Sequence, residues 1–314
     1  RQAFRALPVI IFFSSLISVA YHFGIIQYIV KKISFIMEKT MKTSGTETLS
    51  VSANIFVGQT EAPILIGPFI SSMTNSELMA IMVGGFATAA GSVMALYVSW
   101  LTEIPNIAGH LLAASVMSAP AALMVAKIIY PETKSTKSIR SLSINEGSES
   151  TNVMDAIGKG ATNGMKLAAN VAAMLIAFIS IVAMLNFFLS YIGTSLEDTL
   201  GLLFRPIAWS MGIPWNEAAI VGTLMGEKIV LTELIAFNDL SKLTQQNLLS
   251  ERSSIIASYA LCGFANFGSI GIQLGGIGSM APNRRNDLSN IVLKAMIGGA
   301  IASWLTASIA GILI

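Results

Sequence analysis

The chain has 314 residues, of which 54% are hydrophobic and only 11% are charged, and its formal net charge is +2. Soluble domains average roughly 45–50% apolar and 25% charged residues, so this composition predicts a protein embedded in a lipid bilayer. The basic residues are scattered, Cys262 is the single cysteine and there are two histidines, which disfavours a nucleic-acid partner, a disulfide framework and a Cys/His metal centre.

Six apolar stretches are long enough to cross the membrane, because a hydrocarbon core of about 30 Å takes roughly 20 helical residues. In chain order they are residues 6–30, 78–99, 107–129, 167–192, 255–280 and 291–314. The chain starts at Arg1 without an initiator Met or a signal-peptide pattern and is apolar by Ala6, so we expect an N-terminally truncated fragment that lacks earlier spans. The predicted fold is an all-α integral membrane protein with six transmembrane helices in this fragment.

Two further apolar stretches, 50–73 and 213–238, are interrupted near their middle by polar residues. The interruptions read GQTE at 58–61 and GEK at 226–228, the latter followed by TE at 232–233. Each remaining arm has about ten residues, and a helix of that length reaches only about 15 Å. We therefore predict two re-entrant helical hairpins, which a membrane tolerates only where protein or water surrounds the tip. Glu227 and Lys228 are expected to form a neutralised pair at the second tip.

Lys and Arg are concentrated on one predicted face of the membrane. Thirteen of them lie within 31–42, 127–166 and 284–294, whereas the opposite face receives only Arg205, Lys242 and Arg252. Cytoplasmic loops are enriched in Lys and Arg, so the first face is predicted to be cytoplasmic, as in a bacterial inner membrane. The polar, Ser-rich segment 131–152 is then a cytoplasmic linker between two halves.

The two halves carry the same order of motifs. Thr60-Glu61 is followed by GFAT at 85–88, and Thr232-Glu233 by GFAN at 263–266; each half also opens with an amphipathic stretch, 25–43 or 196–212, that is typical of an interfacial helix. One span lies between the halves, so the second hairpin enters from the opposite face, which predicts an inverted-topology repeat of the kind found in secondary transporters. The predicted organisation is 1–30 as a scaffold transmembrane helix, 31–130 as the first inverted repeat, 131–195 as cytoplasmic linker and central scaffold helix, and 196–314 as the second inverted repeat.

Glu61 and Glu233 are predicted to meet in one cavity and to accept hydrogen bonds from a polar solute, because an unpaired carboxylate inside a membrane is costly. Glycines next to Thr88 and Asn266 weaken their spans, so local unwinding would free backbone carbonyls. With the side-chain oxygens of Asn54 and Thr88 these carbonyls suit a hard cation such as Na⁺. A plain helix start at Thr60 and close helix packing at the glycines are the competing interpretations.

Three stretches resemble the signature sequences of the concentrative nucleoside transporters: NIFVGQTEAP (54–63), GGFATAAGSV (84–93) and YALCGFANFGSIGIQLGGIGSMAP (259–282). The resemblance implies a homotrimer surrounded by membrane lipid, in which each protomer has a scaffold and a mobile transport domain. Such a protein imports a nucleoside by symport with Na⁺ through an elevator-type motion, and it is not an enzyme. Thr232 stands where the family pattern has Asn, and Gly268 where Ser is common.

The resemblance also assigns site residues. Base recognition falls on Gln59, Thr60 and Glu61 with Val93 beside the base, and ribose contacts fall on Glu233, Asn266 and Ser269 with Phe264 lining the pocket. The Na⁺ site falls on the side chains of Asn54 and Thr88 and on the carbonyls of Val57 and Ala89. These assignments are what the family resemblance implies for this chain.

Two alternative functions of the same cavity stay open. A H⁺-coupled symporter would use Glu61 or Glu233 as the proton carrier, although Asn54 with a hydroxyl at position 88 favours Na⁺. A passive nucleoside channel would keep the cavity continuous across the membrane. An intramembrane enzyme has little support, because His22 and His110 are isolated from any Ser or Cys nucleophile pattern.

Overall fold

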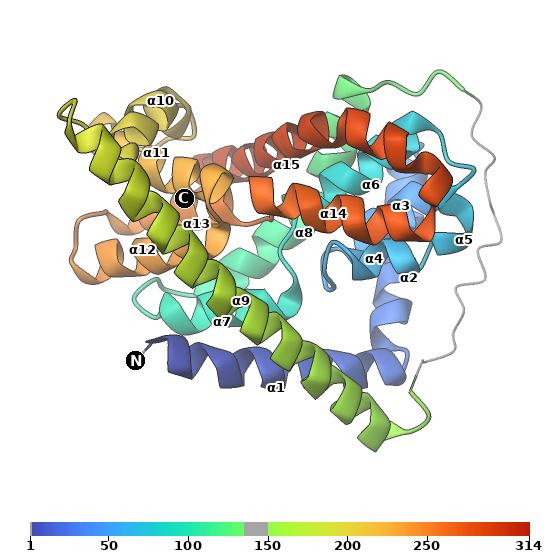
Figure 1. Ribbon diagram of the computed structural model, residues 1–314. Coiled ribbons are helices and arrows are strands. Elements are labelled where there is room, and N and C mark those ends of the chain that lie inside the picture. The colour runs from blue at the N-terminus through green and yellow to red at the C-terminus, as the bar shows by residue number, and fades with distance from the viewer. Residues whose placement is uncertain (1, 135–149) are drawn as a thin grey trace.

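The computed structural model describes residues 2–134 and 150–314, and in these ranges it contains helices and no strand, which confirms the all-α prediction (Figure 1). The predicted linker 131–152 falls mostly on 135–149, outside the described residues. In chain order the helices are α1 (Gln2–His22), α2 (Ile25–Met41), α3 (Gly45–Ala53), α4 (Glu61–Ile64), α5 (Gly67–Ile70), α6 (Asn75–Ala87), α7 (Gly91–Trp100), α8 (Ile107–Ile129), α9 (Val153–Ser190), α10 (Leu196–Ser210), α11 (Trp215–Val230), α12 (Glu233–Gln245), α13 (Glu251–Leu261), α14 (Phe267–Met280), the 3₁₀ helix η1 (Pro282–Arg284) and α15 (Arg285–Leu313).

Within the described ranges, three helical segments are long and apolar enough to cross a membrane: Asn75–Trp100, Ile107–Ile129 and Pro282–Leu313. They coincide with the spans predicted at 78–99, 107–129 and 291–314. The predicted span 167–192 lies mostly within α9, which has 38 residues, and the predicted span 255–280 is divided between α13 and α14.

The first predicted span, 6–30, is wrong in its extent. α1 ends at His22, and the chain bends by 74° into α2. Gly24 makes the bend with φ 72°, a left-handed conformation that glycine adopts without a steric penalty. Residues 25–30 therefore begin α2, which is amphipathic: it buries Ile26 and Val30 and exposes Tyr28 and Phe35.

α1 and α9 pack directly against each other: α9 runs diagonally across the front of the other helices, and α1 lies along their lower edge (Figure 1). Two glycines of α9, Gly160 and Gly164, leave no room for a side chain, since a Cβ there would lie 2.6 Å from the Ser15 Cα and 2.7 Å from the Ile11 Cα. Small residues spaced four apart allow this backbone approach, as is common between membrane helices.

Helices α2–α8 and α10–α15 follow the same order: an amphipathic helix, a helical pair, a span divided by a short break, and a continuous helix. The breaks are residues 88–90 and 262–266, and they lie against each other. Gly263 in the second break has φ +120°, and a Cβ there would be 2.6 Å from the carbonyl oxygen of Ala87, the last residue of α6 before the first break. The two interruptions therefore meet inside the molecule.

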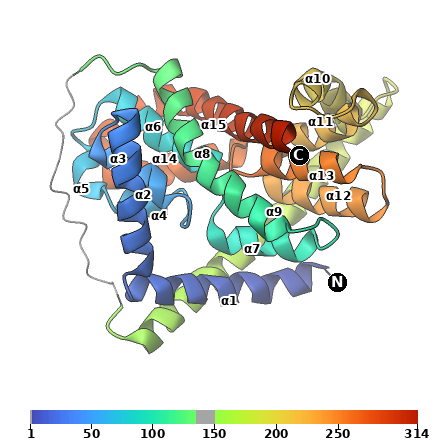
Figure 2. The ribbon, with the colours of Figure 1, turned by 180° about the vertical axis from the view of Figure 1, so that it is seen from behind.

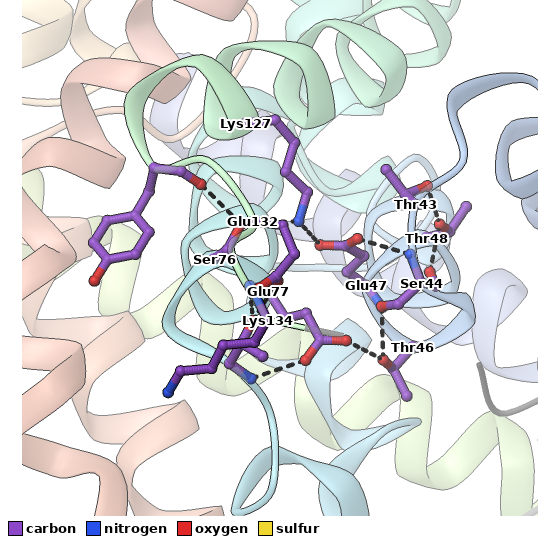
Figure 3. A network of polar contacts seen from close by, with 12 residues as sticks. Thr43, Ser44, Thr46, Glu47, Thr48, Ser76, Glu77, Lys127, Glu132 and Lys134 are labelled. Atoms are coloured by element: carbon purple, nitrogen blue, oxygen red, sulfur yellow. Dashed lines mark hydrogen bonds and ion pairs between the residues drawn. The ribbon is translucent and has the colours of Figure 1, made fainter. Parts of the chain in front are cut away.

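A buried polar network joins the start of α3, the start of α6 and the end of α8 (Figure 3). Glu47 and Glu77 close the capping boxes of α3 and α6. Lys127 of α8 donates to Glu47 Oε2 over 2.7 Å and to Ser76 Oγ over 3.0 Å, and the Thr46 hydroxyl donates to Glu77. Seen from behind, α8 runs beside α3 (Figure 2). The network thus anchors the first helical pair to its neighbours.

Candidate functional site

A cavity of about 1350 Å³ is lined by both halves of the chain. Its walls come from the loop 56–60, α4, the first turn of α7, the start of α12, the break 262–266 and α14, with part of α1 and α9. All eight residues that the sequence analysis assigns to a solute line this cavity: Gln59, Thr60, Glu61, Val93, Glu233, Phe264, Asn266 and Ser269.

The Glu233 carboxylate is buried and is held by neutral donors. Asn266 Nδ2 donates to Glu233 Oε2 over 2.8 Å, and the Tyr97 hydroxyl donates to Oε1 over 3.1 Å. Glu233 is the first residue of α12, where Thr232 caps the helix by accepting from the Ile235 N–H. A negative charge is favourable at this helix end because the free N–H groups carry partial positive charge. The fold therefore supplies an oriented acceptor at the cavity wall.

Tyr97, which the sequence analysis did not single out, fixes the position of this carboxylate. Its ring is buried and stacks on Phe237 with ring centroids 4.0 Å apart and planes 15° apart. Tyr97 lies one turn after Val93 on α7, so both face the same side of that helix. This spacing is the signal from which Tyr97 could have been found.

A chain of hydrogen bonds connects Gln59 to Glu233. Gln59 Nε2 donates to Ser269 Oγ over 3.2 Å, the Ser269 N–H donates to Asn266 Oδ1 over 2.8 Å, and Asn266 in turn donates to Glu233. Asn266 is the N-cap of α14, so its amide orientation is fixed by a backbone donor. The first and second helical pairs thereby share one polar wall.

Glu61 lies at the more open side of the same cavity and is exposed, whereas Glu233 is buried. The Thr60 hydroxyl donates to Glu61 Oε2 over 3.3 Å. Thr60 is the N-cap residue of α4 and Glu61 lies in its first turn, as the plain helix-start interpretation expects, but the Thr60 side chain makes no cap hydrogen bond. The Glu61 carboxylate folds back over Gly58, where a Cβ would come within 2.1 Å of Oε2. Gly58 thus makes room for this carboxylate.

Asn54 is the strongest indication of a cation site. It is completely buried at the end of α3, and neither its Oδ1 nor its Nδ2 has a hydrogen-bond partner in the described structure. Thr88 is buried at the end of α6, where the last carbonyls have no helical N–H partners. Ala89 follows it in the break, also buried, and Val57 lines the cavity. This donor set is all oxygen, which fits a hard cation such as Na⁺. Among residues 2–134 and 150–314, no group of three or more His, Cys, Asp or Glu could hold a metal ion.

Lys228 is buried and its hydrogen bonds go to other helices. Its Nζ donates to the Ala260 carbonyl over 2.9 Å and to Ser303 Oγ over 3.2 Å. Lys228 thus caps the end of α13, where a positive charge is favourable, and its pairing with Glu227 stays a prediction. This cap lies directly before the break that carries Phe264 and Asn266.

Comparisons with known proteins cover nearly the whole chain. A family profile described as "Na+ dependent nucleoside transporter C-terminus" matches residues 110–311, and one described as "Nucleoside recognition" matches residues 3–103. Sodium/nucleoside cotransporter 1 of Mus musculus is 44% identical over 334 residues, which cover 99% of this chain and 51% of the relative. An uncharacterized transporter of Haemophilus influenzae is 43% identical over 99% of this chain and 76% of its own length.

Solved structures agree with these matches. A structure of CNTnw in an inward-facing substrate-bound state has a TM-score of 0.91 at 42% identity, covering 99% of this chain and 74% of that chain. A variant of CNTnw in an outward-facing state has a TM-score of 0.91 at 41% identity, with the same coverage. This chain spans about half the length of the mammalian relatives it matches.

Proposed function

The chain belongs to the Na⁺-dependent, or concentrative, nucleoside transporter family, and we propose that it imports nucleosides across a membrane by symport with Na⁺. The observation that carries the proposal is the hydrogen-bonded wall from Gln59 to Glu233, which lines one cavity. Gln59 follows closely in the chain after Asn54, whose buried amide has no hydrogen-bond partner in the described structure. Family members are integral membrane transporters rather than enzymes, and relatives are named sodium/nucleoside cotransporters.

The proposed architecture is an inverted-topology repeat with six spans and two re-entrant hairpins. The first hairpin is α3 with α4 and α5, and the second is α11 with α12. Two features support it: the shared order of elements in the two halves and the contact between the breaks of the two divided spans. Secondary transporters built this way place their sites where broken helices meet near the membrane midplane.

Within this architecture we assign the base to Gln59, Thr60 and Glu61. Glu61 offers acceptors and Gln59 offers an amide, and together they match a base edge that carries a donor beside an acceptor. Val93 provides apolar contact with the base. The ribose is assigned to the other side of the cavity, where its hydroxyls donate to Glu233 and exchange hydrogen bonds with Asn266 and Ser269, and where Phe264 supplies apolar surface.

Na⁺ is proposed as the coupling ion, bound by the side chains of Asn54 and Thr88 and the carbonyls of Val57 and Ala89. Asn54 and Val57 belong to the loop that continues into Gln59, and the Gly91 N–H donates to the Phe56 carbonyl over 3.2 Å, which ties this loop to α7. A cation at this position would order the base-binding loop, so nucleoside and Na⁺ would each raise the affinity for the other.

The transport step is proposed to be an elevator motion in which the two hairpins and the divided spans move against a scaffold containing α1 and α9. The domain boundaries 31–130 and 196–314 then mark the two mobile repeats, while 1–30 and 131–195 hold the scaffold, except that residues 25–30 begin α2 and belong with the first repeat. Exposed apolar residues on α9 suit contact with membrane lipid or with other protomers of a homotrimer. A bacterial inner membrane fits the distribution of Lys and Arg.

Uptake into proteoliposomes tests this function. With Na⁺ outside and choline inside, radiolabelled uridine should accumulate above its external concentration, and accumulation should vanish when choline replaces Na⁺ outside. Equilibration without accumulation would indicate a passive channel. Accumulation that follows an imposed pH gradient and ignores Na⁺ would indicate H⁺ coupling, with Glu61 or Glu233 as the proton carrier.

A further inference from the structure

Gln273 is a completely buried amide in the Gly-rich helix α14, and it lies outside the set of described residues that line the cavity. Its Nε2 donates two hydrogen bonds, one to Gln59 Oε1 over 3.1 Å and one to the carbonyl of Met82 over 3.1 Å. Gln273 therefore contacts Gln59, which lines the cavity, without lining the cavity itself.

The Met82 carbonyl fixes the direction of these bonds. A backbone carbonyl only accepts, so Gln273 must turn its NH₂ group toward Met82. The second N–H of that group then points at Gln59, which must accept this hydrogen bond with its Oε1. Gln59 is left with its own NH₂ on the other side, where Ser269 Oγ lies at 3.2 Å. The reverse orientation of Gln273 would bring two acceptors together.

The site retains this amide at a cost. Gln273 Oε1 is buried without a hydrogen-bond partner in the described structure, and such an orphaned group is destabilising. Gly85 on α6 provides the space for the pair, since a Cβ there would lie 2.6 Å from Gln273 Nε2 and 3.1 Å from Gln59 Cβ. An apolar side chain at position 273 would remove the unpartnered Oε1, but it would also remove the hydrogen bond that holds the Gln59 amide.

We propose that Gln273 is a positioning residue that sets base preference by holding the Gln59 amide so that its N–H groups face the bound base. The inference rests on the proposed function. An N–H donor from Gln59 beside the acceptor oxygens of Glu61 selects bases with a strong acceptor, a carbonyl oxygen or ring nitrogen, next to an N–H donor. With Gln273 removed, the Gln59 amide can rotate, and it accepts or donates according to the solute.

Thio-substituted uridines test this proposal, because sulfur is a weaker acceptor than oxygen while the neighbouring N3–H is kept. In proteoliposome uptake assays with Na⁺ outside and choline inside, wild-type protein should prefer uridine over either 2-thiouridine or 4-thiouridine by roughly fivefold to tenfold in the apparent affinity ratio. Gln273→Leu and the longer, unbranched Gln273→Met should each bring that ratio below about twofold. Discrimination against 2′-deoxyuridine and the Na⁺ dependence should stay as in wild type.

Two controls separate positioning from general damage. Gln27 is a second buried glutamine that donates to one carbonyl, that of Tyr21, and also has an unpartnered Oε1, but it lies on α2, is not among the described residues that line the cavity and has no hydrogen bond to Gln59. Gln27→Leu should leave the ratio of apparent affinities for uridine and its thio analogues unchanged. In a Gln59→Leu background, Gln273→Leu should have no further effect on the ratio, since its influence passes through Gln59.

Three results would overturn the proposal: a wild-type protein that takes both thio analogues as well as uridine, Gln273 variants that keep the wild-type ratio, or an equal effect of Gln273→Leu with and without Gln59. If Gln273→Leu fails to fold, Gln273→Met decides between these results. Failure of the proposed function is distinguishable, because wild-type protein would then show no Na⁺-driven uridine accumulation at all.

Discussion

The amide of Gln59 donates to the hydroxyl of Ser269 over 3.2 Å, although the two residues are 210 positions apart in the chain. Gln59 belongs to the tip of the first helical pair, and Ser269 to the first turn of α14 in the second half. Since Ser269 and Asn266 connect to Glu233 by hydrogen bonds, a solute bound in the cavity would contact residues of both halves. This arrangement gives each of the following variants a distinct expected effect.

Glu61→Gln should reduce Na⁺-driven uridine uptake at least tenfold while membrane expression stays normal. The change removes the charge that strengthens hydrogen bonds to a base N–H, and hydrogen bonds to charged groups are worth about 1.5–3 kcal/mol. Uptake into vesicles with matched protein content is the measurement. Glu103→Gln, at an exposed carboxylate in the connection before α8, is the control. Wild-type uptake by the Glu61 variant would refute its assigned role.

Gly58→Ala should also weaken uridine binding, because a Cβ at position 58 would lie 2.1 Å from Glu61 Oε2 and the carboxylate would have to move. Binding titrations on purified protein measure the effect, and we expect a loss of roughly tenfold. Gly271→Ala, at a glycine where a Cβ meets nothing within 4 Å, should bind as wild type does. Equal affinities for the two variants would mean that the folded-back position of Glu61 is not used in binding.

Tyr97→Phe isolates the hydrogen bond to Glu233, since phenylalanine keeps the stacking on Phe237. We expect the KM for uridine to rise roughly tenfold, about 1.4 kcal/mol, and 2′- or 3′-deoxy analogues to lose less affinity than in wild type. Glu233→Gln and Asn266→Ala should nearly abolish uptake. Tyr28→Phe, at an exposed tyrosine of α2, serves as the control. An unchanged KM in Tyr97→Phe would show that Glu233 is positioned without the hydroxyl.

Asn54→Ala should raise the Na⁺ concentration needed for half-maximal uptake and leave the uridine affinity at saturating Na⁺ nearly unchanged. The physical reason is that Asn54 supplies a buried oxygen with no protein partner. Uptake measured over a Na⁺ series at several uridine concentrations separates the two effects. Asn290→Ala, on the exposed side of α15, is the matched control. A loss of uridine affinity with unaltered Na⁺ dependence would contradict the assignment.

Lys127→Met should destabilise the protein, because it leaves the Glu47 carboxylate, whose side chain is 1% exposed, without its cation. Thermal unfolding in detergent, followed by tryptophan fluorescence, should show a Tm lower by roughly 5 °C or more. Lys242→Met, which breaks a surface ion pair with Asp239, should change Tm by less than about 2 °C. Adding Glu47→Gln to Lys127→Met should recover part of the loss. Similar Tm values for the two lysine variants would rule out an anchoring role for the network in Figure 3.

Much of the site was predictable, because polar residues in apolar surroundings are conspicuous. Glu61, Glu233 and Asn266 interrupt stretches that otherwise suit a membrane, and the structure brings all eight predicted solute residues to one cavity. Gln273 and Tyr97 were missed for a physical reason. Each lies on a largely apolar helix, and its partner lies 214 or 136 positions away in the chain. The one-turn spacing from Val93 indicates which side of α7 Tyr97 faces, but no local pattern indicates its contact with Glu233.

Two other features could not be predicted from local sequence. The apolar stretch 6–30 hides the bend at Gly24, since both α1 and the start of α2 are apolar enough to continue one span. The cap that Lys228 forms on the end of α13 could not be predicted either, because its partners Ala260 and Ser303 lie 32 and 75 positions away in the chain. By contrast, the family resemblance could be predicted because it rests on long ordered motifs, and the family profiles and relatives confirm it.

Isothermal titration of uridine into the purified protein at graded Na⁺ concentrations, with choline holding the ionic strength, tests the central claim most directly. A cation on Asn54 and Thr88 that orders the loop bearing Gln59 predicts that uridine affinity rises with Na⁺ and that saturating uridine raises Na⁺ affinity by the same factor. Identical uridine affinity in Na⁺ and in choline at constant pH would contradict it.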